Sequence, residues 1–218
     1  MLLLRAPAVY PPQGDTWLLA DAMRAEAVSA DMRVLDLCAG SGALAVAAAR
    51  QGAVDLTAID ISRRAVLSTW INTRLRGLDV RILRGDLLAP VAAERFDLVL
   101  ANPPYVLAAD DRLPTGGAAR CWDAGRDGRA VLDRICAGAP GLLRPGGVLL
   151  VVFSALCGVD ATLDQLAAAG LDASVVSRTI EPFGPVMTAR AGLLEARGVI
   201  QPGQRHEELV VVRGHAPA

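Results

Sequence analysis

The chain has 218 residues, a length that suits one domain with a sizeable buried core. Hydrophobic residues make up 53% of it and charged residues 21%, which excludes an intrinsically disordered chain. The formal net charge of -1 gives no general attraction to nucleic acid or to an anionic membrane, so we expect stable binding to neither.

The side-chain types exclude further chemistries. All 22 basic residues are arginines, so a lysine nucleophile, a Schiff base and a Walker-type phosphate lysine are ruled out. The cysteines form no C-x-x-C pair, and we expect no metal site and small buried thiols of a reducing compartment. With no signal-peptide pattern and no long apolar run, we expect a cytoplasmic protein. The cysteines are Cys38, Cys121, Cys136 and Cys157, and the histidines are His206 and His215.

Short apolar runs alternate with amphipathic stretches, which predicts βαβ units and an α/β fold with a mainly parallel sheet. A first helix is expected through Trp17 and Met23, with Gly14 or Asp15 as its N-cap. The next expected elements are, in chain order, strand 33–38, helix 43–50, strand 54–59, helix 63–75 capped by Ser62, strand 80–83, strand 96–101, helix 128–139, strand 148–153, helix 160–169, and late strands 173–177 and 209–212.

Two long stretches interrupt this alternation. Residues 102–125 are rich in proline and glycine, and an irregular segment of that length inside a compact domain is usually functional. Residues 180–206 form an insert between the last two strands, with one short helix at 186–196, and a tight turn at 144–147 precedes the strand at 148–153. We expect one domain over residues 1–218, of which 1–30 are an N-terminal segment and helix.

A glycine-containing turn follows the first expected strand, with the sequence Asp-Leu-Cys-Ala-Gly-Ser-Gly at residues 36–42. Its glycines let the backbone approach a ligand closely, and the next helix offers free N–H donors. The spacing of Gly40, Gly42 and Ala45 also fits a dinucleotide-binding fingerprint, and a tight turn without a ligand stays open as well. Asp36 favours a ligand with an ammonium group, such as a methionine moiety, over a pyrophosphate.

Two more acidic residues follow expected strands. Asp60 can accept hydrogen bonds from both hydroxyls of a ribose, with Ile61 against an adenine face, although a helix cap or a surface acid would look the same. NAD and S-adenosylmethionine both carry adenosine, so Asp60 does not separate them. Asp86 can accept a hydrogen bond from an adenine amino group, and ordinary turn chemistry is the alternative.

The run Asn102-Pro103-Pro104-Tyr105 follows the strand expected at 96–101. A planar NH₂ on an amide or an aromatic ring is a poor nucleophile, because its lone pair is delocalised. The Asn102 side-chain oxygen and the Pro103 carbonyl can accept its two N–H groups and hold the nitrogen toward a sulfonium methyl. Consecutive prolines stiffen the loop, and Tyr105 can stack on the planar acceptor. In this strand context we prefer N-methyl transfer to the alternative of a plain loop.

These motifs resemble the HemK/PrmC-like and Mtq-type methyltransferases, which use S-adenosylmethionine to methylate the glutamine side-chain amide in the Gly-Gly-Gln loop of peptide-chain release factors. The resemblance covers roughly residues 9–180 and the last strand. Residues 9–19 are similar to the family's N-terminal motif, whose threonine lies by the cofactor, and residues 125–128 to its Gly-x-Asp-Gly segment, for which a helix cap is the alternative. The resemblance implies the class I methyltransferase fold, which is a Rossmann-like, mostly parallel seven-stranded sheet with helices on both faces and an antiparallel last strand. The catalytic residues it implies are Asn102, Pro103, Pro104 and Tyr105, and the cofactor-binding residues are Thr16, Asp36, Cys38, Ala39, Gly40, Gly42, Asp60, Ile61, Asp86, Leu87 and Asn102.

The chain departs from the family pattern in three ways. Cys38 replaces the first glycine of the usual Gly-x-Gly-x-Gly, and a small thiol is expected to be tolerated there. The helical domain by which bacterial HemK proteins grip the release factor has no counterpart, as in the shorter Mtq-type enzymes, which work with a small zinc-binding activator subunit. The resemblance therefore implies a release factor as protein substrate and leaves such an activator open. The insert at 180–206 is longer than the family's.

Several alternatives stay open at this point. The same Asn-Pro-Pro-Tyr motif serves the adenine amino group in DNA and RNA methyltransferases, although the net charge, the 4% aromatic content and the lack of a target-recognition domain disfavour it here. A small-molecule amine or a lysine side chain could also be the acceptor. A nicotinamide-dependent oxidoreductase would use Gly40, Gly42 and Asp60 but would leave Asn102 unexplained, and an inactive cofactor-binding subunit would not need Tyr105.

Overall fold

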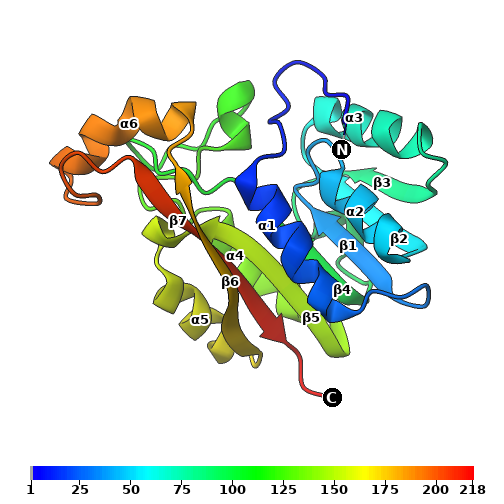
Figure 1. The fold of residues 1–218 in the computed structure, drawn as a ribbon. Helices are drawn as coiled ribbons and strands as arrows, with labels where there is room; N and C mark the ends of the chain where they lie inside the picture. The colour runs from blue at the N-terminus through cyan, green and yellow to red at the C-terminus, as the bar shows by residue number, and fades with distance from the viewer. Residues whose placement is uncertain (1) are drawn as a thin grey trace.

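The computed structural model describes residues 2–218, and its frame is a seven-stranded sheet with helices packed around it (Figure 1). The strand order is β3-β2-β1-β4-β5-β7-β6. The strands β1 to β5 pair in parallel, whereas β7 runs antiparallel to both β5 and β6. The strands are β1 (Arg33–Leu37), β2 (Asp55–Asp60), β3 (Val80–Arg84), β4 (Phe96–Ala101), β5 (Leu143–Ser154), β6 (Asp172–Pro182) and β7 (His206–His215).

Six α-helices and five short 3-10 helices connect the strands (among residues 2–218). The α-helices are α1 (Gly14–Met23), α2 (Ala43–Gln51), α3 (Arg63–Arg74), α4 (Leu132–Gly138), α5 (Val159–Ala168) and α6 (Pro185–Ala196). The 3-10 helices are Arg24–Glu26, Ala89–Val91, Ala118–Cys121, Ala139–Leu142 and Ala155–Cys157. None of the helices in the described range is long and apolar enough to cross a membrane.

The sheet carries a hydrophobic core on each face, because successive side chains of a strand point to opposite sides. On β4, Leu98 and Leu100 pack with helices α1 and α2, whereas Val99 and Ala101 pack with α4 and its neighbours. The strand β5 divides in the same way, which explains its near-continuous apolar sequence. The expected α/β class I fold, mostly parallel with helices on both faces and an antiparallel last strand, is therefore confirmed.

The N-cap predicted for the first helix is wrong. Gln13 occupies that position with extended backbone angles, Gly14 is already helical, and no side chain caps the helix. Asp15 is not the N-cap because it is the second residue of the helix, and its carboxylate accepts hydrogen bonds from Thr16 and Tyr105. The cap predicted at Ser62 is confirmed, since its hydroxyl accepts a hydrogen bond from the Ala65 amide.

Other boundaries also differ from the expected ones. The helix expected at 128–139 begins only at Leu132, because the chain turns at Gly128, which has a φ of +75°. The turn expected at 144–147 lies inside β5, where the pairing with β4 shifts register. The strands β6 and β7 are longer than predicted, so the insert shrinks from residues 180–206 to residues 183–205. Their extra length comes from backbone pairing with each other, to which side-chain patterns contribute little.

Candidate functional site

A cavity of about 390 Å³ lies at the carboxyl ends of β1, β2, β3 and β4. The order of the strands reverses between β1 and β4, and open α/β sheets bind ligands at such a point. The turns after all four strands contribute to the lining, so the motifs that are separate in the sequence meet here. Among the predicted site residues, Asp36 and Gly42 lie behind the wall, and the others line the cavity.

The turn after β1 forms one wall through an unusual backbone conformation. Cys38, Gly40 and Gly42 have φ angles of +60°, +58° and +78°, in the region that favours glycine. At Gly42 a Cβ would stand 2.9 Å from Thr69 Cγ2, so a larger residue would push α2 away from α3. The thiol at Cys38 is tolerated in this conformation and partly exposed to the cavity, which corrects the expectation of a buried core residue. Cys121 is likewise partly exposed and lines the cavity.

Asp60 organises the turns at the end of β2. Its Oδ2 accepts the Gly40 amide at 2.9 Å and its Oδ1 accepts the Ser62 amide at 2.8 Å. Each carboxylate oxygen keeps a second lone pair that can accept a hydrogen bond from a hydroxyl group of a ligand. Desolvation raises the pKa of Asp60, so an ionised Asp60 gains from donors or a positive charge brought by a ligand.

Asp36 lies beneath the glycine turn and is only 1% exposed. Its Oδ2 accepts the Ala45 amide at 3.1 Å, whereas Oδ1 has no hydrogen-bond partner in the part of the chain that the structure describes. Burial raises the pKa of Asp36 to about 7. A buried carboxylate oxygen without a partner fits a site completed by a cationic ligand.

The wall formed after β3 is more open. Asp86 lines the cavity, and its exposed carboxylate forms an ion pair with Arg134 at 2.7 Å. Leu87 is buried, and its backbone has a φ of +49°. Ile61 lies on the same lining. An apolar slot edged by a carboxylate is compatible with the adenine position expected from the sequence.

A further part of the lining contains the run from Asn102 to Tyr105 and the first turn of α1. The Asn102 Nδ2 donates to Thr16 Oγ1 at 3.2 Å, and the Thr16 hydroxyl donates to Asp15 Oδ1 at 3.1 Å. The Tyr105 hydroxyl donates to Asp15 Oδ2 at 3.1 Å. Desolvation and the nearby Asp15 carboxylate raise the pKa of the Tyr105 phenol, which therefore keeps its proton and donates.

Sequence reasoning missed Asp15 as a site residue, because it was interpreted as a helix cap. Its side chain is 6% exposed and lies on the cavity lining. The signal was its position directly before Thr16 in the N-terminal motif. An acidic side chain in such a motif has two interpretations, and only the contacts distinguish them.

Helix α6 braces the segment 102–125. Arg190 donates from Nη1 to the Leu107 carbonyl at 2.9 Å, and its Nη2 lies 2.5 Å from the Asp123 carboxylate. At the C-terminal end of α6, Arg197 donates to the carbonyls of Ala108 and Arg126. The helix predicted within the insert is therefore confirmed. It contacts the loop that follows Asn102, and the sequence did not indicate this contact.

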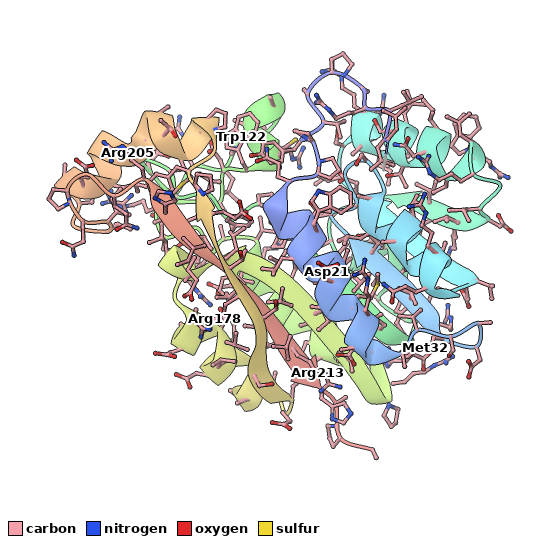
Figure 2. All side chains as sticks on the ribbon, in the orientation of Figure 1. Asp21, Met32, Trp122, Arg178, Arg205 and Arg213 are labelled. Carbon is pink, nitrogen blue, oxygen red and sulfur yellow. The ribbon has the colours of Figure 1, made fainter. Side chains whose placement is uncertain are left out.

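The segment before α1 closes over the same cavity. The Cys121 thiol donates to the Ala8 carbonyl at 3.3 Å. The rings of Tyr10 and Trp122 lie 5.9 Å apart, and Trp122 is labelled in Figure 2. The N-terminal segment and the loop therefore contact each other, and both line the cavity.

The sequence is similar to known methyltransferases over most of its length. It matches the family model of the methyltransferase small domain over residues 13–116. A relative from Methanocaldococcus jannaschii, named as a candidate protein N5-glutamine methyltransferase, is 31% identical over 85% of this chain and 92% of the relative. The human methyltransferase HEMK2 is 33% identical over a region that covers 66% of this chain and 71% of the human protein.

The chain belongs to the HemK/PrmC-like and Mtq-type family of S-adenosylmethionine-dependent methyltransferases. The bacterial relatives of this methyltransferase are longer. A release factor glutamine methyltransferase from Bordetella pertussis is 40% identical over 66% of this chain, which spans 56% of that relative. Membership of the family also shows that the alternative of a nicotinamide-dependent oxidoreductase is wrong.

Solved structures share the fold of this methyltransferase. The Mtq2–Trm112 complex of E. cuniculi, responsible for the methylation of the eRF1 translation termination factor, has a chain that matches with a TM-score of 0.64 and 22% identity, over 96% of this chain and 99% of that one. The T. thermophilus 16S rRNA N2 G1207 methyltransferase, in complex with AdoMet and guanosine, matches with a TM-score of 0.59 and 20% identity, over 94% of this chain and 44% of that one. At these identities the likeness concerns the fold.

Proposed function

We propose that this methyltransferase methylates the side-chain amide nitrogen of the glutamine in the Gly-Gly-Gln loop of a peptide-chain release factor. One observation carries the proposal. The Asn102 carboxamide stands at the end of β4 with its NH₂ held by Thr16, and its Oδ1 accepts no hydrogen bond from the described residues. A primary amide brings two N–H donors, and Asn102 Oδ1 with the Pro103 carbonyl offers two acceptors. The glutamine activity in the names of several relatives supports this choice of acceptor.

The residues in the turns after β1, β2 and β3 fit S-adenosylmethionine. We assign the ribose to Asp60, the adenine to the slot between Ile61 and Leu87 with Asp86 at its edge, and the methionine end to the glycine turn. The unpartnered Oδ1 of Asp36 and the desolvated Asp60 both favour a ligand with positive charge. The remaining cofactor residues in this assignment are Cys38, Ala39, Gly40, Gly42 and Asn102, whereas the Thr16 hydroxyl contacts Asn102.

The protein's part in the reaction is positioning. When bound, S-adenosylmethionine supplies a methyl group whose C–S bond breaks as the C–N bond forms, leaving the electron pair on the sulfur of S-adenosylhomocysteine and one amide proton for water. Asn102 Oδ1 and the Pro103 carbonyl hold the acceptor nitrogen in line, and the two prolines keep both acceptors rigid. Tyr105 covers the flat face of the acceptor amide, with its phenol tied to Asp15. No strong base is required, because the sulfonium is a good leaving group.

We further propose that a small partner subunit assists this chain, and that this subunit binds zinc. The support is the similarity in fold to the Mtq2 chain, which was solved as a complex with Trm112.

The test is transfer of tritiated methyl from S-adenosylmethionine by the purified protein. Parallel reactions contain a release factor, the same factor with its loop glutamine changed to alanine, bulk DNA, or bulk RNA, each with and without a Trm112-type subunit. We expect label in the intact release factor alone and none with the Asn102→Ala enzyme. Label in nucleic acid alone would overturn the glutamine proposal in favour of an adenine acceptor, and label in the glutamine-free factor would indicate another protein side chain.

A further inference from the structure

We propose that Asp15, acting through the Thr16 hydroxyl, fixes which end of the Asn102 carboxamide faces the methyl acceptor. Asp15 and Thr16 are positioning residues. The inference rests on the proposed function, which places the methyl-accepting amide at Asn102. Thr16 was expected from sequence to contact the cofactor, so this gives its hydroxyl a different task.

Three donors surround the Asp15 carboxylate. The Thr16 amide, the Thr16 hydroxyl and the Tyr105 hydroxyl all donate to it, at 2.6, 3.1 and 3.1 Å. An ionised carboxylate only accepts hydrogen bonds, so the single proton of the Thr16 hydroxyl is committed to Asp15. Toward Asn102 the same oxygen can then offer only a lone pair.

This commitment determines the orientation of Asn102. The end of its carboxamide 3.2 Å from Thr16 Oγ1 must be the NH₂, because a carbonyl oxygen there would face another acceptor. The carbonyl oxygen is thereby directed away from Thr16. A flipped Asn102 would turn its NH₂ group toward the amide nitrogen that is to be methylated. That nitrogen carries N–H donors of its own, so no hydrogen bond would hold it and the reaction geometry would be lost.

The same carboxylate also positions Tyr105. Asp15 Oδ1 controls Asn102 through Thr16, whereas Oδ2 receives the phenol directly. One buried side chain on the first turn of α1 therefore positions both the carboxamide of Asn102 and the ring of Tyr105. Both Asp15 and Thr16 are more than nine-tenths buried, so water competes little for these hydrogen bonds.

The kinetic test compares Thr16→Val with Thr16→Ser. Valine keeps the shape and removes the hydroxyl, and we expect kcat to fall about tenfold or more while the cofactor Kd and the release factor KM stay within about threefold. Serine keeps the hydroxyl and should restore most of kcat. Thr57→Val is the matched control, because Thr57 is buried but its hydroxyl has no partner among residues 2–218. An unchanged kcat in Thr16→Val, or a loss confined to cofactor affinity, would overturn the inference.

A second readout needs no methyl acceptor. Asn72 and Asn102 are the two asparagines of the chain, so ¹⁵N-asparagine labelling gives two side-chain NH₂ pairs, and Asn102→Ala identifies one of them. We expect the Asn102 pair to move in Thr16→Val and to return in Thr16→Ser. The Asn72 pair should stay, because it donates to the carbonyls of Leu4 and Ser41. An Asn102 pair that does not move would overturn the orientation even if the enzyme is active. If it moves as expected but the wild type labels no release factor, the orientation stands and the proposed function fails.

Discussion

The two walls of the cavity are built in different ways. The cofactor wall comes from consecutive strand-to-helix turns after β1, β2 and β3, within residues 36–87. The acceptor wall combines the loop after β4 with the first turn of α1 and with braces from α6, near the other end of the chain. In Figure 1, α3 and α6 lie on opposite sides of the molecule with the loop between them. In the proposed assignment the cofactor is held by local turns, whereas the acceptor wall depends on contacts between distant segments.

The largest expected effect is on the acceptor wall. Asn102→Ala removes the side-chain acceptor for the amide nitrogen, so turnover should be abolished while cofactor affinity stays within a few-fold. Calorimetric titration of the cofactor and single-turnover methyl transfer measure the two quantities separately. Normal turnover in this variant would mean that Asn102 does not hold the acceptor.

The counterpart on the cofactor wall is Asp60→Ala. Loss of charge-assisted hydrogen bonds to ribose should weaken cofactor binding by about 1–3 kcal/mol. Because Asp60 also accepts the Gly40 and Ser62 amides, thermal unfolding of the variant is needed alongside the titration. Unchanged affinity in a folded variant would place the adenosine elsewhere.

The buried Asp36 predicts a pH dependence of cofactor binding. Its pKa of about 7 means that it is largely protonated below that pH and ionised above it, and only the ionised form attracts a cationic ligand. Affinity should therefore rise as pH increases from 6 to 8, by about tenfold at most, and Asp36→Asn should remove the rise. A pH profile that is the same in both proteins would show that Asp36 does not sense the cofactor.

The smallest expected effect concerns the brace from α6. Arg190→Met keeps the apolar stem but removes the ion pair with Asp123 and the hydrogen bond to Leu107. We expect the release factor KM to rise about fivefold with cofactor affinity unchanged, because the loop loses order that binding must restore. Arg178→Met, at an exposed pair with Glu208, is the matched control and should change neither value. Equal KM values in the two variants would mean that α6 does not support substrate binding.

Much of the cofactor wall could be predicted from the sequence. The strand β3 agrees within one residue with the apolar run at 80–83, the Ser62 cap was expected, and the carboxylates of Asp60 and Asp86 line one cavity. These features depend on alternation, on turn residues and on the rule that parallel strands present their carboxyl ends at one edge. All of them act over a few residues or follow from the fold class.

What only the tertiary structure decided are the contacts that span the chain. Thr16 meets Asn102 across 86 positions and Tyr105 meets Asp15 across 90, so an acid that looks like a helix cap becomes the anchor of the acceptor wall. Arg190 reaches Leu107 across 83 positions, and β6 and β7 extend beyond their apolar residues because each pairs with the other. Local patterns record which face of an element is buried. They do not record which distant donor will occupy a given acceptor, because that choice is made by the packing of the whole fold.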